Sequence, residues 1–236
     1  MTDVGKMPPA LLVATRNAGK LFELVPMIEA AGLRPLSLNE SGIAPSPDEE
    51  ALERFDTFEE NALAKARYFF ARSDGVAVLA DDSGLVVEAL GGAPGVRSKR
   101  WSSTLSSEAH AAADAQERPL SIDAANNRAL LDALARAPDR RAKFVCVAAI
   151  AWKGGTVNAR GEILGRIVAR DRGSHGFGYD PLFFSDELSK TFGEATREEK
   201  AHVSHRARAV RAVLDAFAES ARRERNAGVD RARDGR

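Results

Sequence analysis

The sequence has little cysteine, no long hydrophobic run and no excess of either charge. Cys146 is the one cysteine among 236 residues, which excludes an intramolecular disulfide framework and a metal site made of several cysteines. No apolar stretch approaches the roughly 18–20 residues of a membrane-spanning helix. The 34 Lys and Arg residues balance the 34 Asp and Glu residues, so no overall positive field would attract nucleic acid. An anionic ligand must therefore be bound by a local cluster of donors.

The rest of the composition is ordinary for a globular protein. Hydrophobic residues make up 44% and charged residues 29%, well away from the range of disordered chains. Cys146 lies in the apolar run Phe144–Ala148, which favours an inert buried thiol. The first ten residues contain no apolar segment after their lysine, so we expect no secretory signal and a cytoplasmic location.

Strand and helix patterns are mixed along the chain. Short apolar or β-branched runs predict strands at residues 11–14, 76–80, 85–90, 143–152 and 157–170. Helical periodicity predicts helices at residues 21–31, from 57 to about 70, within 107–136 and at 204–221. This mixture indicates an α/β or α+β fold with a central sheet. We expect residues 1–10 to be a loose leader, residues 11–221 the folded domain, and the arginine-rich residues 222–236 a disordered tail.

The segment Thr15–Lys20 lies between the first predicted strand and the first predicted helix. Backbone N–H groups and the helix dipole favour an anion at such a place, and Thr15, Asn17 and Lys20 add side-chain donors. A Walker A loop would need Gly at position 14 and Ser or Thr at position 21, where the chain has Ala14 and Leu21. The segment is therefore either a phosphate-binding loop of another kind or a solvated turn.

Asp81-Asp82-Ser83-Gly84 follows a predicted buried strand. Ligands of α/β sheets bind beyond the carboxyl ends of strands, and two adjacent carboxylates repel unless a cation or donors offset their charge. Oxygen ligands suit Mg²⁺. One or two acidic residues between Asp48 and Glu60 could complete a metal site with Asp82. The alternative is a turn in which one Asp forms a cap.

Two later segments carry further candidate residues. Gly173–Asp180 combines glycines, which let the backbone approach a ligand, with aromatic rings that could stack on a base. A glycine-rich hairpin with core aromatics would give the same pattern. Lys200 is followed by Ser204-His205-Arg206, which puts cations in a first helical turn, against the dipole. That placement points either to a nearby anion or acceptor, or to simple surface charge.

Five stretches in this order resemble the inosine triphosphate pyrophosphatase family, the Ham1-like hydrolases of non-standard purine nucleotides. They are LLVATRNAGKLFEL (11–24), TFEENALAKARYF (57–69), VLADDSGLVVEALGGAPGVRSKRW (78–101), GRIVARDRGSHGFGYDPLFF (165–184) and TFGEATREEKAHVSHRARAV (191–210). Together they span the chain from about residue 11 to 217, and five ordered blocks are far more specific than any one of them.

The resemblance implies an α/β fold in which a curved mixed β-sheet with flanking helices forms two lobes around a central nucleotide cleft. It implies a homodimer that hydrolyses ITP, dITP and XTP to the monophosphate and pyrophosphate with Mg²⁺. Neither a membrane nor a nucleic-acid partner is expected.

The resemblance also implies roles for individual residues. Asp82 matches the catalytic carboxylate, which also binds the metal, and Glu53 matches a second carboxylate of the metal site. The residues that match substrate contacts are Thr15, Arg16, Asn17, Ala18, Gly19 and Lys20 at the triphosphate, Ser83 beside Asp82, Phe177, Gly178, Tyr179 and Asp180 at the base, with Phe177 stacking, and Lys200, His205 and Arg206 on the far wall. His205 and Arg206 would read the purine oxygens.

Three alternatives remain open from the sequence. A related pyrophosphatase could prefer pyrimidine or modified nucleotides, and a nucleotide-binding regulator could bind without turnover. RNA binding through the arginine-rich residues 222–236 is a third, which the balanced net charge disfavours.

Overall fold

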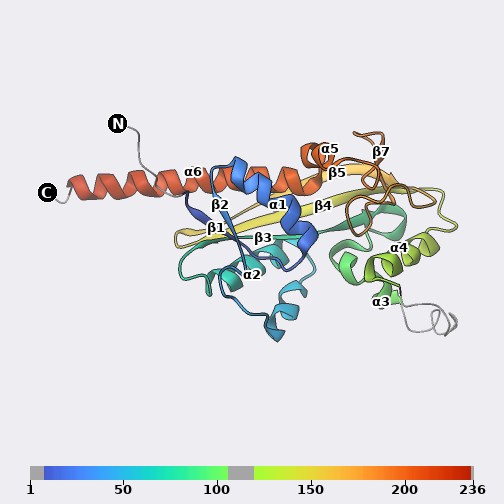
Figure 1. The fold of residues 1–236 in the computed structure, drawn as a ribbon, viewed down its shortest axis with the longest axis horizontal. Coiled ribbons are helices and arrows are strands. Elements are labelled where there is room, and N and C mark those ends of the chain that lie inside the picture. Colours follow the sequence, from blue (N-terminus) through green and yellow to red (C-terminus); the bar gives the residue numbers. More distant parts are fainter. Residues whose placement is uncertain (1–7, 106–119, 235–236) are drawn as a thin grey trace. The chain divides into compact units, whose positions relative to one another are not determined.

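The computed structural model describes residues 8–105 and 120–234, and the chain divides into two compact units (Figure 1). Unit 1 contains residues 1–82, 146–161 and 206–236, and unit 2 contains residues 83–145 and 162–205. This division agrees with the two predicted lobes, while the nucleotide cleft stays a prediction. Parts of the predicted leader (1–7) and of the predicted helix at 107–136 (107–119) lie outside the described residues.

The described strands form one mixed sheet in the order β2-β1-β3-β4-β5-β6-β7. Their bounds are β1 Ala10–Val13, β2 Arg34–Ser37, β3 Ala77–Val87, β4 Arg141–Trp152, β5 Gly155–Ile167, β6 Phe183–Ser185 and β7 Lys190–Thr191. Strand β1 pairs in parallel with β2 and β3, whereas β6 pairs antiparallel with β5 and β7. The predicted α/β class and mixed sheet are therefore confirmed.

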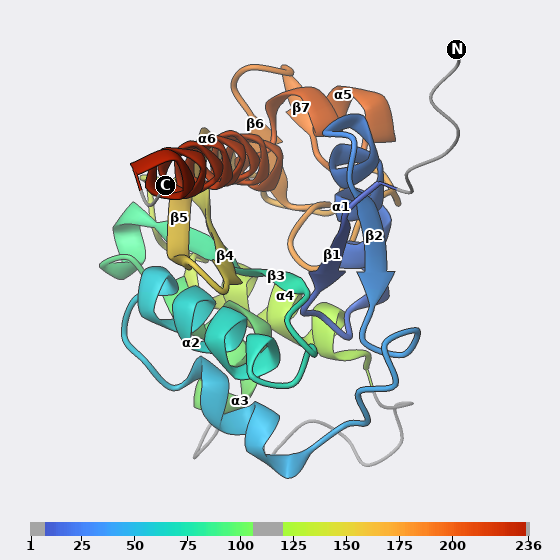
Figure 2. The same cartoon turned by 90° about the vertical axis from the view of Figure 1, so that its left-hand side faces the viewer.

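Helices cover both faces of the strands of unit 1 (Figure 2). Helices α1 (Ala18–Ala30) and α6 (His205–Asp234) lie on one face, and α2 (Phe58–Phe70) lies on the other. The core under α1 and α6 is built from the buried side chains Leu11, Val13, Leu24, Ile28, Leu79, Cys146, Ala148, Ile150, Ala209, Val210, Val213 and Leu214. Because side chains alternate along a strand, Leu12, Val78 and Ala80 are buried on the face that α2 covers.

Unit 2 has a core of its own. The helices of this unit are α3 (Trp101–Leu105), α4 (Ile122–Ala133) and α5 (Arg197–Val203), with the 3₁₀ turns η2 (Glu88–Leu90) and η3 (Gly95–Arg100). Leu130 and Leu134, at the end of α4, belong to one buried cluster with Phe144, Phe183 and Phe192. The rings of Phe144 and Phe192 stack with their centroids 5.8 Å apart. The ring of His205, which follows α5, packs against this aromatic cluster.

Helix α1 begins at Ala18, three residues earlier than its apolar periodicity predicts. Asn17 causes the early start, because its side-chain Oδ1 accepts a hydrogen bond from the Lys20 N–H at 3.0 Å. Half of the predicted phosphate loop is therefore the first turn of a helix. The helix continues through Pro26, although proline contributes no N–H to its hydrogen bonds.

The sequence context predicts that a strand ends just before Asp81 and Asp82. In the structure, both residues lie in the middle of β3 instead. Strand β3 runs from Ala77 to Val87 and contains the first half of the apolar run at 85–90, which we expected to be a separate strand; Glu88–Leu90 form the 3₁₀ turn η2. The parallel neighbour β1 stops at Val13, opposite Leu79. The two carboxylates thus lie just beyond the carboxyl end of β1, where Lys20 of α1 pairs with Asp81 and Asn61 of α2 donates to Asp82.

The expectation that residues 222–236 form a disordered tail is wrong for residues 222–234, which continue α6 to Asp234. Arg and Ala favour helices, and Arg223 pairs with Glu219 one turn earlier. The indole Nε1 of Trp152, at the end of β4, donates to Glu224 at 3.2 Å. This contact fixes the helix to the strands well past Ala221, where we expected it to end.

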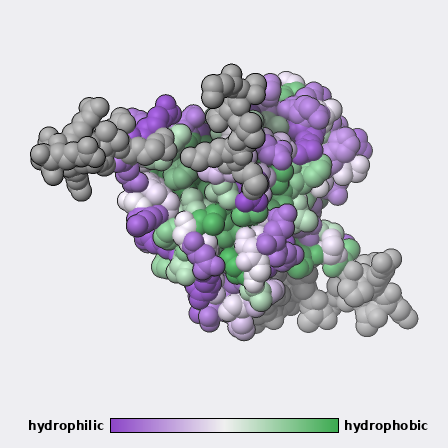
Figure 3. All heavy atoms as spheres, turned by 60° about the vertical axis from the view of Figure 1, so that its left-hand side comes forward, coloured by the Kyte–Doolittle hydropathy of each residue, from purple (hydrophilic) through white to green (hydrophobic). Residues whose placement is uncertain are grey.

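Hydrophilic and hydrophobic residues both reach the face of the molecule drawn in Figure 3. The large exposed hydrophobic side chains are Phe22, Phe55, Leu120, Ile122 and Leu164. Single exposed residues of this kind are normal on soluble proteins. Within residues 8–105 and 120–234, no helix has the length and hydropathy needed to cross a membrane.

Candidate active site

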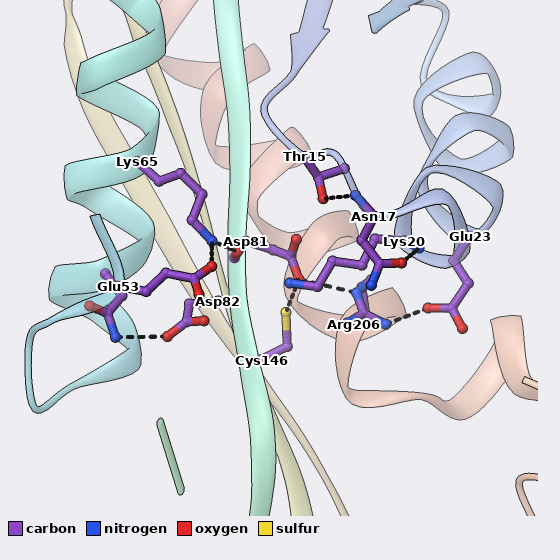
Figure 4. A network of polar contacts seen from close by, with 11 residues as sticks. Thr15, Asn17, Lys20, Glu23, Glu53, Lys65, Asp81, Asp82, Cys146 and Arg206 are labelled. Carbon is purple, nitrogen blue, oxygen red and sulfur yellow. Dashed lines mark hydrogen bonds and ion pairs between the residues drawn. The ribbon is translucent and has the colours of Figure 1, made fainter. Parts of the chain in front are cut away.

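Asp81 is the centre of a buried ionic cluster in unit 1 (Figure 4). Its Oδ2 lies 2.9 Å from Nζ of Lys20, on α1, and 3.1 Å from Nε of Arg206, on α6. The Sγ of Cys146, on β4, lies 3.9 Å from the same oxygen. Arg206 also pairs through Nη1 with Glu23 of α1. The carboxylate of Asp81 thus holds the side chains of Lys20 and Arg206 in place.

Asp82 faces a different set of partners, supplied by α2 and the 3₁₀ helix η1 (Pro47–Glu53). The Asn61 side-chain amide donates to Oδ2 of Asp82 at 2.9 Å. Lys65, one turn further along α2, donates from Nζ to Glu53 at 2.7 Å and to the backbone carbonyl of Asp81 at 3.0 Å. Lys65 therefore joins Glu53 to the strand that carries both aspartates, and Asp82 lies beside this pair (Figure 4).

The two adjacent aspartates have opposite electrostatic environments. Burial by itself would raise the pKa of Asp81, but the charges of Lys20, Arg206 and Lys65 outweigh burial and hold this pKa well below its ordinary value. Burial dominates at Asp82, so its pKa lies above the ordinary value even though Lys65 and Lys20 act against this. Asp81 is a fixed anion, while Asp82 is the carboxylate better suited to exchange a proton.

The segment Thr15–Lys20 contributes several kinds of contact. Thr15 Oγ1 accepts from the Asn17 N–H at 3.2 Å, and Ala18, Gly19 and Lys20 form the first turn of α1. First-turn N–H groups have no partner within their own helix and favour an anion. Arg16 does something else: its guanidinium donates to Glu49 at 2.7 and 2.8 Å and to the Ile43 carbonyl at 3.2 Å. Arg16 thereby holds η1, which ends in Glu53.

The carboxylates offer oxygen ligands for a divalent cation but form no complete cage. Nowhere in the described part of the chain do three Asp, Glu, His or Cys side chains converge to hold a metal by themselves. Asp81 Oδ1 is buried and accepts no hydrogen bond from the described residues. Asp82 and Glu53 supply carboxylate oxygens close by. This donor set fits Mg²⁺, which takes one or two carboxylates and completes its shell with water and phosphate oxygens.

Unit 2 brings together the residues predicted to hold the base. Asp180 Oδ2 accepts from the Phe177 N–H at 2.8 Å and from Nζ of Lys200 at 2.6 Å. The Lys200 Nζ also lies 5.1 Å from the centroid of the Phe177 ring. Tyr179 is buried and donates from its hydroxyl to the Ser98 carbonyl at 2.9 Å. The loop is therefore folded around Asp180 and Lys200 rather than extended into solvent.

The other predicted contacts lie in two different settings. The His205 ring stacks on Phe144 with a centroid distance of 4.6 Å and an angle of 10°. Ser83 follows Asp82 in β3 and is partly buried. Arg206 was expected beside Lys200 and His205, but the structure pairs its guanidinium with Asp81 and Glu23, so a role in reading the base stays a prediction.

Asn61, Lys65 and Glu23 were not singled out from the sequence. Asn61 and Lys65 are four residues apart, on the same helix face as the buried Ala62 and Ala66. Polar residues on an apolar helix face were the available signal, because such residues are buried only with partners. Cys146 was correctly predicted to be buried, and burial raises the pKa of its thiol.

A family model described as "Ham1 family" matches residues 11–216. The chain belongs to the Ham1 family. It is 45% identical over 215 residues to a dITP/XTP pyrophosphatase of Mycolicibacterium paratuberculosis, which covers 90% of this chain and 97% of the relative. The resemblance inferred from the five sequence blocks is confirmed.

Solved structures of Ham1 members share the fold of this chain. The Ham1 protein of Staphylococcus aureus is 32% identical, with a TM-score of 0.69 over 89% of this chain and 98% of that one. A dITP/XTP pyrophosphatase from Mycobacterium abscessus is 38% identical, with a TM-score of 0.62 over 87% and 98%. The matches cover nearly the whole length of these Ham1 proteins.

Proposed function

We propose that this chain hydrolyses ITP, dITP and XTP to the nucleoside monophosphate and pyrophosphate, with Mg²⁺ as the metal. The observation that carries the proposal is the ionic cluster of unit 1, in which Lys20 and Arg206 pair with the Asp81 carboxylate and Lys65 donates to the Asp81 backbone carbonyl, next to Asp82. The names of the Ham1 relatives support the same reaction and the same substrates.

The charge of the cluster supports a need for metal. Three cations, Lys20, Lys65 and Arg206, stand against the four carboxylates of Glu23, Glu53, Asp81 and Asp82. Such a cluster does not offset the negative charge of a triphosphate. Bound Mg²⁺, held by Asp82 and Glu53, would supply that positive charge and polarise the phosphate oxygens.

The residues of unit 1 would share the chemical step. Lys20 and the first-turn N–H groups of Ala18 and Gly19 bind and orient the phosphates. Asp82 accepts a proton from the attacking water, a role that its raised pKa favours. The water oxygen bonds to the α-phosphorus, the bond to the bridging oxygen breaks, and pyrophosphate leaves. Asp81 stays ionised and holds Lys20 in place.

The residues of unit 2 would hold the base. The Phe177 ring offers a stacking surface, and Asp180 fixes the backbone on which that ring is carried. ITP and XTP carry an acceptor at position 6, where ATP carries a donor. A donor such as His205 or Arg206 aimed at this position would reject ATP. We also propose a homodimer in the cytoplasm, which the resemblance implies and which size-exclusion chromatography with light scattering would test for the assembly.

The test is ³¹P NMR of the purified protein with ITP, XTP, GTP and ATP, each with Mg²⁺ and with EDTA. We expect rapid release of pyrophosphate from ITP and XTP, far slower release from GTP and ATP, and none without Mg²⁺. Asp82→Asn is the matched control, since it keeps the size of the side chain and should abolish the product. Orthophosphate as the product would contradict the attack at the α-phosphorus.

Two other results would favour the alternatives. Tight binding of nucleotide without any product would indicate a regulator. Turnover of pyrimidine or other modified triphosphates in preference to ITP would indicate a related pyrophosphatase with another base preference.

A further inference from the structure

Helix α4 binds the predicted base loop through both the N–H and the carbonyl group of one residue, Gly178. The N–H of Gly178 donates to Asp123 Oδ2 at 2.8 Å, and the Asn127 side-chain amide donates to the Gly178 carbonyl at 3.1 Å. Asp123 and Asn127 are four residues apart and therefore project from the same face of α4. Gly178 has a φ of +61°, a conformation that glycine adopts readily.

Asn127 is an unusual residue for its position. It is 9% exposed, in a helix whose neighbouring positions Ala129 and Leu130 belong to the core. Only its NH₂ group can donate to the Gly178 carbonyl, so the orientation of the amide is fixed. Its Oδ1 is then buried and accepts no hydrogen bond from the described residues. A buried acceptor without a donor destabilises a fold, so packing alone does not explain an amide here.

The rest of the loop is tied down at other points. Asp180 binds the Phe177 N–H, and the Tyr179 hydroxyl binds the Ser98 carbonyl. Gly178 joins Phe177 to Tyr179, so the placement of its backbone affects the position and orientation of the Phe177 ring. The contact with Asn127 is a part-buried hydrogen bond that the Gly178 carbonyl accepts from α4.

We propose that Asn127 is a positioning residue that determines base selectivity by fixing the Gly178 peptide. The proposal rests on the proposed function, in which this loop holds the purine. It adds a residue outside the five sequence blocks to the determinants of substrate choice. Phosphate binding should be unaffected, because Lys20, Lys65 and Asp82 belong to unit 1 whereas Asn127 belongs to unit 2.

The experiment compares Asn127→Ala with Asp132→Ala, a truncation on the exposed side of the same helix. Steady-state kcat and KM are measured for ITP, GTP and ATP, together with Tm. For Asn127→Ala we expect the ITP:GTP and ITP:ATP ratios of kcat/KM to fall about tenfold, mainly through a higher KM for ITP. Asp132→Ala should keep the wild-type ratios.

Three further variants distinguish a loss of this contact from simple misfolding. Asp123→Asn keeps an oxygen that can accept from the Gly178 N–H and should keep the selectivity, whereas Asp123→Ala should reduce it. Asn127→Asp places an oxygen against the Gly178 carbonyl. As the pH falls this carboxyl is protonated and can donate, so selectivity should recover in acid relative to the wild-type enzyme at the same pH.

Unchanged substrate ratios in Asn127→Ala and Asn127→Asp would overturn the proposal, even if the variants had a lower Tm. A loss of activity in equal proportion for all three nucleotides would also overturn it, because that is the result of a purely structural role. A wild-type protein that does not hydrolyse ITP would instead refute the proposed function, and the same panel reports that outcome separately.

Discussion

The neighbouring carboxylates of Asp81 and Asp82 should respond in opposite ways to the same substitution. Asp81→Asn removes the charge that pairs Lys20 and Arg206 in a buried setting, where both cation side chains are 15% exposed or less. Breaking a buried ion pair in this way costs about 3–5 kcal/mol. For a protein of this size each kcal/mol changes Tm by about 2–4 °C, so Tm should fall by about 6–20 °C.

Asp82→Asn should leave the fold as stable as before or stabilise it by about 0.5–2 kcal/mol. Burial opposes the charge of Asp82, as its raised pKa indicates, and an asparagine oxygen can still accept from the Asn61 amide. The same change removes the proposed base and should lower kcat by about 10²–10⁴-fold. Stability and activity would therefore change in opposite directions.

The pH dependence of the two effects provides a further check. The pKa of Asp81 is lowered in the folded protein, so its contribution to stability is present above the ordinary Asp pKa and is lost as pH falls through the folded value. The difference in free energy of unfolding between Asp81→Asn and the wild type should become smaller in acid. The pKa of Asp82 is raised, so the stability advantage of Asp82→Asn should be fully present above that raised pKa, shrink as the pH falls through it, and vanish below the ordinary Asp pKa.

The assay is thermal and urea unfolding of the wild type and both variants in EDTA, at several pH values between about 2 and 8, where carboxyl groups with lowered, ordinary and raised pKa values titrate. Asp132→Asn, an exposed carboxylate on α4, is the control and should change stability by no more than about 0.5 kcal/mol. If Asp82→Asn loses as much stability as Asp81→Asn, the electrostatic distinction between the two residues is refuted.

Three other substitutions test separate parts of the cluster. Lys20→Ala should lower kcat/KM about 10²–10³-fold for ITP and XTP alike, and a changed ITP:GTP ratio in steady-state assays would argue against phosphate binding. Lys65→Met should raise the Mg²⁺ concentration needed for half-maximal rate, because Glu53 loses its 2.7 Å partner; an unchanged titration would place Glu53 outside the metal site. Arg206→Ala should destabilise the fold by about 3–5 kcal/mol, measured by urea unfolding, because it leaves Asp81 with one fewer cation. An unchanged ITP:ATP ratio in the same variant would remove Arg206 from base reading.

Local signals in the sequence predicted much of the secondary structure. The helix expected from residue 57 to about 70 is α2, which Thr57 caps by accepting a hydrogen bond from the Glu60 N–H. The β-branched run at 143–152 forms β4, and the family blocks identified the mixed α/β sheet. These features depend on residues within a few positions of one another, or on periodicity along one element, so a sequence contains them directly.

Errors arose where distant residues decide the outcome. The pattern at Asp81 and Asp82 resembles the end of a strand, yet β3 continues, and side chains from α1, α2 and α6 bind the two carboxylates there. The arginine-rich segment after Ala221 resembles a disordered tail, yet it is helical and its Glu224 binds Trp152. In both cases the stabilising partner is more than 20 residues away in the sequence.

The sequence by itself determined the family, the fold class and the segments that bear the site, because ordered motifs and local periodicity need no knowledge of contacts. Tertiary structure alone decided which functional groups meet: that Lys65 joins Glu53 to β3, that Arg206 binds Asp81, and that Asn127 holds Gly178. It also decided that two identical neighbouring side chains differ in acidity. Burial and charge around each carboxylate set its pKa, and both are properties of the folded chain.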